Sequence, residues 1–314
     1  MKGIRGAESR QGVLRIRKFV STFVRNRFNP RIMKRDLPKC RPAVLLRPLA
    51  LLLLGLAITS CGETARPLHP KAKGVTRLVT YNVGVFSKYL DGGSYAMIAD
   101  MMREIDADAV AMNELDSCTV RTRGIFQLQR AADLLGGWDC NYGAAMPFSG
   151  GAYGEGIASR ERPVRSFSVV MERGEGAEPR VLVVSEFARY VYATTHLDHV
   201  SAAQRAVQAE TINRIMMREY GTSPKPVFLG GDLNDTPDSE PLRILRKAWK
   251  ILTPAEATFS SHDPQTCIDY ILQLDNGAAC EVLGARVLKQ FRTGDVRQAS
   301  DHLPVLLDVR LPER

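Results

Sequence analysis

Asp232 and Asn234 stand two residues apart, directly after an apolar run at residues 227–229 and the pair Gly230 and Gly231. The apolar run predicts a short buried strand, and the glycines predict a sharp turn where it ends. In extended backbone, positions i and i+2 share a face, so we expect the carboxylate and the amide to lie side by side. Such a pair can hold a hydrated metal ion or a phosphate; the alternative is an ordinary turn rich in Asp, Asn and Gly.

Oxygen-bearing side chains also stand at the ends of other predicted strands. Asn82 ends an alternating β-rich run, Glu114 ends a second apolar run, and Asp301 precedes the last one. Glu114 and Asp301 are hard oxygen ligands, and Asn82 and Asp232 can add oxygen contacts. This set predicts a site for Mg²⁺, Mn²⁺ or Ca²⁺ rather than zinc.

Two histidines belong to the same set, because His196 follows a predicted strand and His302 follows Asp301. Both can carry protons near neutral pH. Asp269, within a predicted strand, could orient one of them, and the alternative is a purely structural partner for a carboxylate that is costly to bury alone. A cation, two histidines and few other nucleophiles indicate metal-assisted attack by water. A phosphodiester is the natural target, because the metal neutralises charge on its non-bridging oxygens.

The elements that position these side chains alternate between strand and helix patterns. Helices are predicted at residues 95–104, 126–135 and 201–220, the last opened by a capping box of Ser201 and Gln204, with a further helix after Thr236 or Ser239. The glycine-rich residues 150–156 are predicted as a loop. Strands are predicted at residues 75–83, 109–114, 157–159, 164–171, 180–185, 188–195, 227–229, 267–272, 280–287 and 305–309.

The formal net charge of +9 comes from the N-terminal segment. Residues 1–60 hold 14 of the 43 Lys and Arg and 2 of the 34 Asp and Glu, which leaves 29 basic and 32 acidic residues from Cys61 onward, a net charge of −3. Duplex binding relies on neutralising many phosphates, so this balance disfavours nucleic acid as a partner without excluding a nuclease. No dinucleotide-binding glycine motif follows a strand, which argues against an oxidoreductase.

Residues 1–60 have the pattern of an export signal. An uncharged apolar run at residues 49–59 follows four basic residues at 34–41 and is too short to span a bilayer comfortably. The sequence ITSC at residues 58–61 resembles a bacterial lipobox, in which Cys61 is lipidated and anchors the protein to a membrane. The alternative is a soluble protein with an apolar N-terminal helix.

These features predict the organisation of the whole chain. We expect a signal peptide at residues 1–60, a lipid anchor and tether at 61–74, and a folded domain at 75–314. Because Met33 begins a conventional signal peptide by itself, residues 1–32 are interpreted as an over-long extension. The expected location is the bacterial cell envelope, on its periplasmic or outer side.

Six cysteines are present, two of which fall in the signal peptide and at the lipid site. The other four are an even number in a chain with an export signal, which permits two disulfides. Three connectivities are possible, and we expect the pairs nearest in sequence, Cys118 with Cys140 and Cys267 with Cys280. The first disulfide would contribute ~3 kcal/mol.

Six short motifs occur in order along the chain: TYNV at residues 80–83, NE at 113–114, THLD at 195–198, GDLN at 231–234, IDYI at 268–271 and SDH at 300–302. In this order they resemble the endonuclease/exonuclease/phosphatase superfamily, which includes deoxyribonuclease-like, neutral sphingomyelinase-like and inositol-phosphatase enzymes. The resemblance covers about residues 75–312. It implies a four-layer α/β/β/α sandwich of two packed, mostly antiparallel sheets with the site at one end.

The resemblance also implies the role of each cation and phosphate ligand. Glu114 would bind Mg²⁺, or else Mn²⁺ or Ca²⁺, helped by Asn82 and Asp301. Asp232 and Asn234 would hold the phosphate and the attacking water.

The implied proton-transfer groups are the two histidines. His302, oriented by Asp269, would be the general base, and His196 would stabilise the developing charge or protonate the leaving oxygen. Tyr153 and Glu155 stand where deoxyribonuclease-like members have a Tyr-x-Glu whose Glu supports the first histidine.

The sequence departs from the family pattern in two places. The segment around Tyr153 and Glu155 is rich in glycine, and Asn113 precedes Glu114 where Gln is usual. His199, close to the first histidine, is expected only to cap the following helix.

The predicted function is therefore that of a membrane-anchored, Mg²⁺-dependent hydrolase of phosphodiesters. Its substrate could be a lipid head group, a nucleic acid or a small phosphoester, and no obligate protein partner is expected. The alternative is a catalytically inactive surface lipoprotein that uses the same fold for binding. That alternative predicts the loss of a site residue, whereas every expected position is filled.

Overall fold

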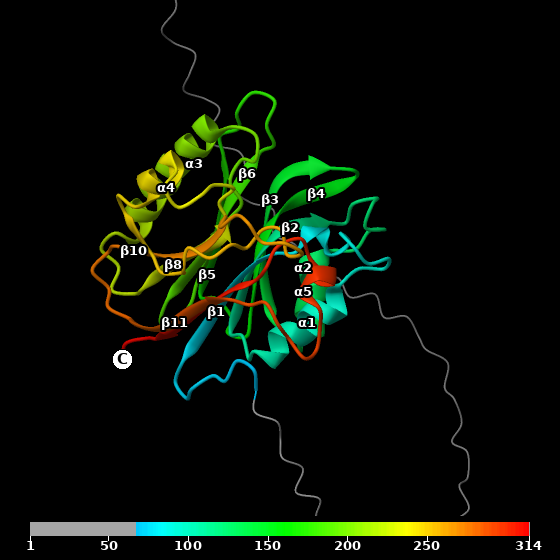
Figure 1. The fold of residues 1–314 in the computed structure, drawn as a ribbon. Helices are drawn as coiled ribbons and strands as arrows, with labels where there is room; N and C mark the ends of the chain where they lie inside the picture. Colours follow the sequence, from blue (N-terminus) through cyan, green and yellow to red (C-terminus); the bar gives the residue numbers. More distant parts are fainter. Residues whose placement is uncertain (1–66, 314) are drawn as a thin grey trace, which may run out of the picture. The chain divides into compact units, whose positions relative to one another are not determined.

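The computed structural model describes residues 67–313. Two six-stranded sheets pack face to face, with the strand orders β11-β12-β1-β2-β4-β3 and β5-β6-β7-β8-β10-β9 (Figure 1). The strands are β1 (Thr76–Asn82), β2 (Ala109–Ser117), β3 (Asp139–Phe148), β4 (Gly151–Ser159), β5 (Arg165–Met171), β6 (Arg180–Glu186), β7 (Val191–Thr195), β8 (Val227–Asp232), β9 (Trp249–Ile251), β10 (Asp269–Leu274), β11 (Glu281–Val287) and β12 (Val305–Arg310). The helices are α1 (Tyr95–Glu104), α2 (Gln127–Leu134), α3 (Ala202–Tyr220), α4 (Glu240–Leu245) and α5 (Val296–Ala299), with a 3-10 turn at Gly84–Phe86.

Each sheet has one parallel pair at its centre, β1 with β2 and β7 with β8, and its other neighbours are antiparallel. Parallel strands end at the same edge, so Asn82 on β1 lies opposite Asn113 on β2. In the second sheet, β8 ends where its antiparallel partner β10 begins, which places Asp232 opposite Asp269. The topology therefore brings together the polar ends of β1, β2, β8 and β10. The sequence predicted a site formed at such strand ends.

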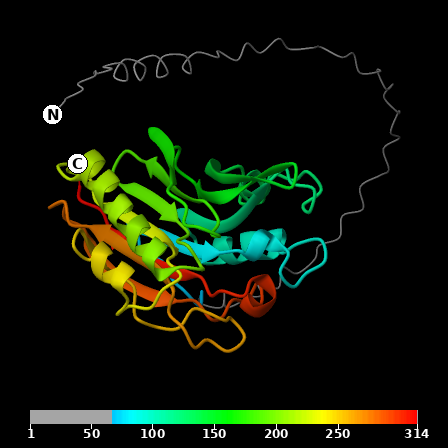
Figure 2. The same ribbon diagram turned by 90° about the horizontal axis from the view of Figure 1, so that it is seen from above.

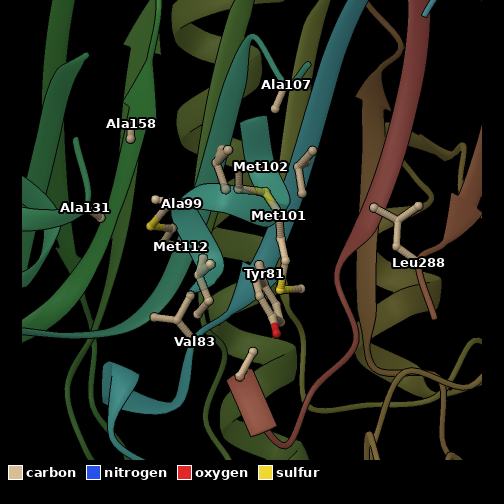
Figure 3. Close-up of a cluster of buried hydrophobic side chains, with 14 of the residues drawn as sticks. Tyr81, Val83, Ala99, Met101, Met102, Ala107, Met112, Ala131, Ala158 and Leu288 are labelled. Atoms are coloured by element: carbon tan, nitrogen blue, oxygen red, sulfur yellow. The ribbon is translucent and has the colours of Figure 1, made fainter. Parts of the chain in front are cut away.

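Hydrophobic clusters fill the spaces between the layers, and three of them are large. One lies between the first sheet and the helices α1 and α2, where Tyr81 and Met101 are fully buried (Figure 3). A second lies between the other sheet and α3 and α4, and a third, with Phe228, lies between the two sheets. Figure 2 shows α3 and α4 together on one side, with α1 and α5 on the other. The predicted four-layer α/β/β/α sandwich of mostly antiparallel sheets is confirmed.

The structure corrects the prediction for the segment around residues 139–159. The glycine-rich residues 150–156, expected as a loop, belong almost entirely to β4, and β3, which the sequence did not predict, pairs with β4 along its length. A Cβ at Gly154 would lie 2.0 Å from the carbonyl oxygen of Gly143. Glycine here marks a close approach of two strands rather than a loop.

The two predicted disulfides are wrong. Within residues 67–313, Cys118, Cys140, Cys267 and Cys280 are all free thiols. Cys140 lies level with the start of the nine-residue strand β2, whereas Cys118 follows its end. Cys267 precedes β10, whereas Cys280 Sγ lies 3.4 Å from Gln273 Oε1 near its other end. A disulfide needs Cα atoms within about 7 Å, whereas the length of β2 or β10 separates the two cysteines of each pair by roughly 20 Å.

Residues 69–71, expected as part of the tether, are held against the domain. The fully buried Arg77 donates to the carbonyl oxygens of His69 (2.8 Å) and Pro70 (3.0 Å) and forms an ion pair with Asp308 (2.7 Å). The predicted signal peptide and the lipidated Cys61 lie outside the described residues. Within residues 67–313, no helix combines the length and the apolar composition that a membrane crossing needs.

Candidate active site

Asn82 joins the two sheets at the edge where their parallel strands end. Its Nδ2 donates to Glu114 Oε1 on β2 (3.0 Å) and to Asp232 Oδ2 on β8 (3.1 Å). Its Oδ1 accepts from the backbone N–H of Gly84 (3.1 Å). Asn113 adds a second link, because its Oδ1 accepts from the backbone N–H of Asp232 (3.0 Å). Asn82 therefore presents N–H groups, not its oxygen, to the two carboxylates.

Unusual backbone geometry directs two of these side chains. Glu114 sits in a bulge of β2 and has a φ of 58°, which is uncommon for any residue other than glycine. On β8, a Cβ at Gly231 would lie 1.9 Å from the carbonyl oxygen of Thr195, so only glycine lets β7 and β8 approach here. The bulge and the glycine explain how Glu114 and Asp232 reach the same edge.

His302 lies between two carboxylates of the second sheet. Its Nδ1 lies 2.9 Å from Asp269 Oδ2, and its Nε2 lies 3.6 Å from Asp232 Oδ2. Thr258 Oγ1 also donates to Asp269 Oδ2 (2.6 Å) and steadies that carboxylate. Burial alone lowers the pKa of His302, but the charges of Asp269 and Asp232 outweigh it and raise the pKa to about 10. Asp269 thus orients the ring so that Nε2 faces Asp232.

His196 is buried, and each of its ring nitrogens faces one nitrogen and one carboxylate. Nδ1 lies 3.2 Å from Arg180 Nη1 and 3.9 Å from Glu155 Oε1. Nε2 lies 2.8 Å from Asn234 Nδ2 and 3.3 Å from Asp232 Oδ2. Burial lowers the pKa of His196 well below its usual value, and the charge of Arg180 adds to this effect. The ring is therefore neutral at pH 7 and can donate one hydrogen bond.

Sequence reasoning missed Arg180, which is buried at the start of β6 and donates through Nη2 to His199 Nδ1 (3.0 Å). Arginine is mostly a surface residue, so nothing in the sequence signalled this role. His199, expected only as a helix cap, lines the same pocket as His196. Glu155 was indicated by the Tyr-x-Glu motif; it accepts from Asn113 Nδ2 (3.0 Å), and burial raises its pKa to about 7.

These side chains surround a pocket of about 400 Å³. Asn82 and Asp269 do not line it, but each is buried and bonded to a residue that does. The predicted site residues that line it are Glu114, His196, Asp232, Asn234, Asp301 and His302. The structure therefore brings all eight predicted residues to one place.

The carboxylates of Glu114 and Asp301 favour a positive charge. Lys88 Nζ lies 2.9 Å from Asp301 Oδ2. This hydrogen bond raises the pKa of Lys88 against the opposing effect of burial, and the charges of Asp301 and Glu114 raise it further. Two carboxylates that already attract an ammonium group also suit a hard divalent cation such as Mg²⁺ or Ca²⁺.

A second group of possible ligands lies deeper. Asp232, Asp269 and His302 place ligand-type atoms within 4.8 Å of one another. All three are buried, and the 2.9 Å contact between His302 and Asp269 is that of a hydrogen bond. We interpret this group as a hydrogen-bonded relay, because Mg²⁺ and Ca²⁺ prefer oxygen ligands to imidazole.

Comparisons with known proteins agree with this fold. Similar solved structures include an endonuclease/exonuclease/phosphatase family protein from Bacteroides thetaiotaomicron, with a TM-score of 0.59, 17% identity, and coverage of 75% of this chain and 94% of that chain. They also include a mannosyl-6-phosphatase from Bacteroides thetaiotaomicron VPI-5482 (TM-score 0.60, 16% identity, 74% and 99% coverage) and the catalytic domain of human Nocturnin (TM-score 0.57, 15% identity, 77% and 96% coverage). At these identities the likeness shows a shared fold. No curated protein sequence matches the chain.

The family comparison extends over most of the chain. The model of the Endonuclease/Exonuclease/phosphatase family matches residues 79–302, a range that contains every predicted site residue. The match therefore includes the whole second sheet, the first sheet apart from β12 and the start of β1, and the edge where Asn82, Asp232 and His302 meet. The protein belongs to the Endonuclease/Exonuclease/phosphatase family.

Proposed function

We propose that the protein is a metal-dependent phosphoesterase that hydrolyses a phosphodiester by attack of an activated water. The observation that carries the proposal is the buried line of Asp269, His302 and Asp232 beside a pocket that also holds His196 and Asn234. Members of the family are hydrolases of phosphoesters, which supports the same reaction class.

Glu114 and Asp301 would hold the cation, with Mg²⁺ as the first expectation; bound there, it would neutralise charge on the phosphoryl oxygens and lower the pKa of His302. In its neutral form, His302, held at Nδ1 by Asp269, would take a proton from the attacking water at Nε2. His196 is neutral and stabilises the developing charge as a hydrogen-bond donor.

The substrate and the location are parts of the same proposal. We expect a lipid head group, a nucleic acid or a small phosphoester, and among proteins of similar fold one is a mannosyl-6-phosphatase. The lipobox-like sequence at residues 58–61 supports a lipoprotein of the bacterial envelope, anchored through Cys61.

The test is turnover by the full chain, with and without Mg²⁺, of duplex DNA, sphingomyelin, phosphatidylinositol and a chromogenic phosphodiester. We expect Mg²⁺-dependent turnover of at least one, with His302→Ala lowering kcat by about 10²- to 10⁴-fold, the usual contribution of a general base. His262→Ala, at an exposed position outside the pocket, is the matched control. A folded protein that turns over none of the four would contradict the proposal.

A further inference from the structure

One wall of the pocket consists of residues that have no role in the proposed hydrolysis. Arg121, Met146, Phe148 and Tyr153, together called the Arg121 wall, line the same pocket as Glu114. They come from the loop after β2, from the end of β3 and from β4. The wall therefore belongs to the segment of the chain that the sequence predicted least well.

Buried groups hold the Arg121 wall in place. Arg121 Nε and Nη2 donate to Asp116 Oδ2 (2.6 Å) and Oδ1 (2.8 Å), and the Asp116 side chain is fully buried. The guanidinium carbon of Arg121 lies 4.5 Å from the ring centroid of Phe148. The backbone N–H of Val120 donates to the carbonyl oxygen of Ser149 (2.8 Å), which ties the loop to the turn between β3 and β4. Side chains held in this way lose little conformational entropy when a ligand binds.

The chemistry of the wall suits a ring that carries hydroxyl groups. Asp116 balances the charge of Arg121. The two hydrogen bonds between them use Nε and Nη2 of Arg121, so the N–H groups on its Nη1 can donate to a hydroxyl of the ligand. Phe148 and Tyr153 add apolar ring surface, and Glu178, 43% exposed and also lining the pocket, adds an acceptor. Apolar surface with a few well-placed polar groups is the usual lining of a small-molecule site.

Size and charge also favour a small substrate. A volume of about 400 Å³ lies within the usual range for small-molecule pockets. Among the lining residues, all in the described part of the chain, only Arg121 and Arg180 are Lys or Arg, and both are already bonded, to Asp116 and to two histidines respectively. A duplex would require many free cations to neutralise its phosphates.

We propose that the Arg121 wall is the leaving-group subsite and takes a polyhydroxylated ring carried on the phosphoester, as in a sugar phosphate or a nucleotide. This inference rests on the proposed phosphoesterase function and names its substrate class. Water adds to phosphorus, the bond from phosphorus to the ester oxygen that carries the ring breaks, and the ring leaves as an alcohol with one proton of the water. The phosphate keeps the water oxygen.

The test compares kcat/KM of the full chain with Mg²⁺ for the methyl diesters of glucose 6-phosphate and adenosine 5′-monophosphate (the ring esters), dimethyl phosphate, a duplex oligonucleotide and sphingomyelin vesicles. We expect a ring ester to be preferred over dimethyl phosphate, the duplex and the vesicles, and the two ring esters distinguish a sugar source from a nucleotide source. Preference for the duplex or for the vesicles overturns the subsite. Turnover of a chromogenic diester without turnover of either ring ester would also overturn the proposed subsite, while leaving the proposed function intact. Absence of turnover of every ester would contradict the proposed function itself.

Variants test the wall directly. In Arg121→Ala and Phe148→Ala we expect the ratio of kcat/KM for the ring ester to that for dimethyl phosphate to fall about tenfold, mainly through KM. Tenfold corresponds to about 1.4 kcal/mol, which is the order of one net hydrogen bond or one ring contact with the substrate. Arg121→Lys keeps a charge beside Asp116 and should show the same loss even if Arg121→Ala is unstable. Arg123→Ala, exposed in the same loop, is the matched control. An equal loss on all substrates overturns the inference.

Discussion

His302 keeps its positive charge in a buried place because Asp269 lies 2.9 Å from its Nδ1. The folded-state pKa of about 10 is above the unfolded value of 6.5, so the pair stabilises the fold fully below pH 6.5, and this contribution is lost as the pH rises through about 10. The Asp269→Asn substitution removes the negative charge beside His302, whereas the histidine stays buried. We therefore expect the stability advantage of the wild type over Asp269→Asn to shrink between pH 6.5 and 10, as measured by urea unfolding without metal.

The control for this pH dependence is Asp263→Asn, which removes a carboxylate at an exposed position. Its stability should track that of the wild type at both pH values. An advantage over Asp269→Asn that stays constant, or grows with pH, would show that the ion pair between Asp269 and His302 does not set the charge of the histidine.

At the scale of single residues, the sequence predicted the groups that stand at strand ends. Asn82, Asp232 and His302 could be found because polar side chains at such positions are unusual and occur in a familiar order. Arg180 and Arg121 could not, because a basic residue in a sequence is usually a solvated one. Their partners are 16 and 5 residues away along the chain, and only folding brings them into contact.

At the scale of elements, Gly154 allows β3 and β4 to pair closely. We expect Gly154→Ala to destabilise the fold by about 1–3 kcal/mol, because its Cβ would meet the backbone of Gly143, which cannot move aside as a flexible side chain would. The midpoint of urea unfolding measures this loss. Gly284→Ala on β11 is the control, because the nearest atom to its Cβ is Arg286 Nη2 at 4.0 Å. Equal midpoints for the two variants would refute the explanation of the glycine-rich strand.

The strands that the sequence predicted share one property. β1, β6 and β12 are rich in Val, Leu, Ile or Thr, which fit a buried pleated surface. β3 and β4 are rich in Gly and Ala, residues that have little intrinsic preference for strands. Their conformation is set by the pairing of β3 with β4 and of β4 with β2. This pairing depends on residues outside each segment, so the sequence of the segment alone does not predict a strand.

At the scale of the whole molecule, residues 67–313 belong to one compact unit, and their four cysteines, Cys118, Cys140, Cys267 and Cys280, are free thiols. We expect thermal unfolding curves of this unit to coincide with and without reductant, and thiol titration after unfolding to count all four. A disulfide worth ~3 kcal/mol would instead raise the midpoint by several degrees. A lower unfolding midpoint in the presence of reductant would instead support the disulfides predicted from the sequence.

β12 enters the first sheet between β11 and β1, two segments that lie far apart along the chain. His302 stands just before this strand, whereas Asn82 and Glu114 belong to the first two. On the ribosome, the growing chain therefore contains Asn82 and Glu114 long before it contains His302, the residue proposed to take the proton from water. Contacts that join residues 76 and 309 also form late, because long-range pairing is slow. We therefore expect the proposed hydrolase to be inert until residues 302–310 have been translated and β12 has paired with β1.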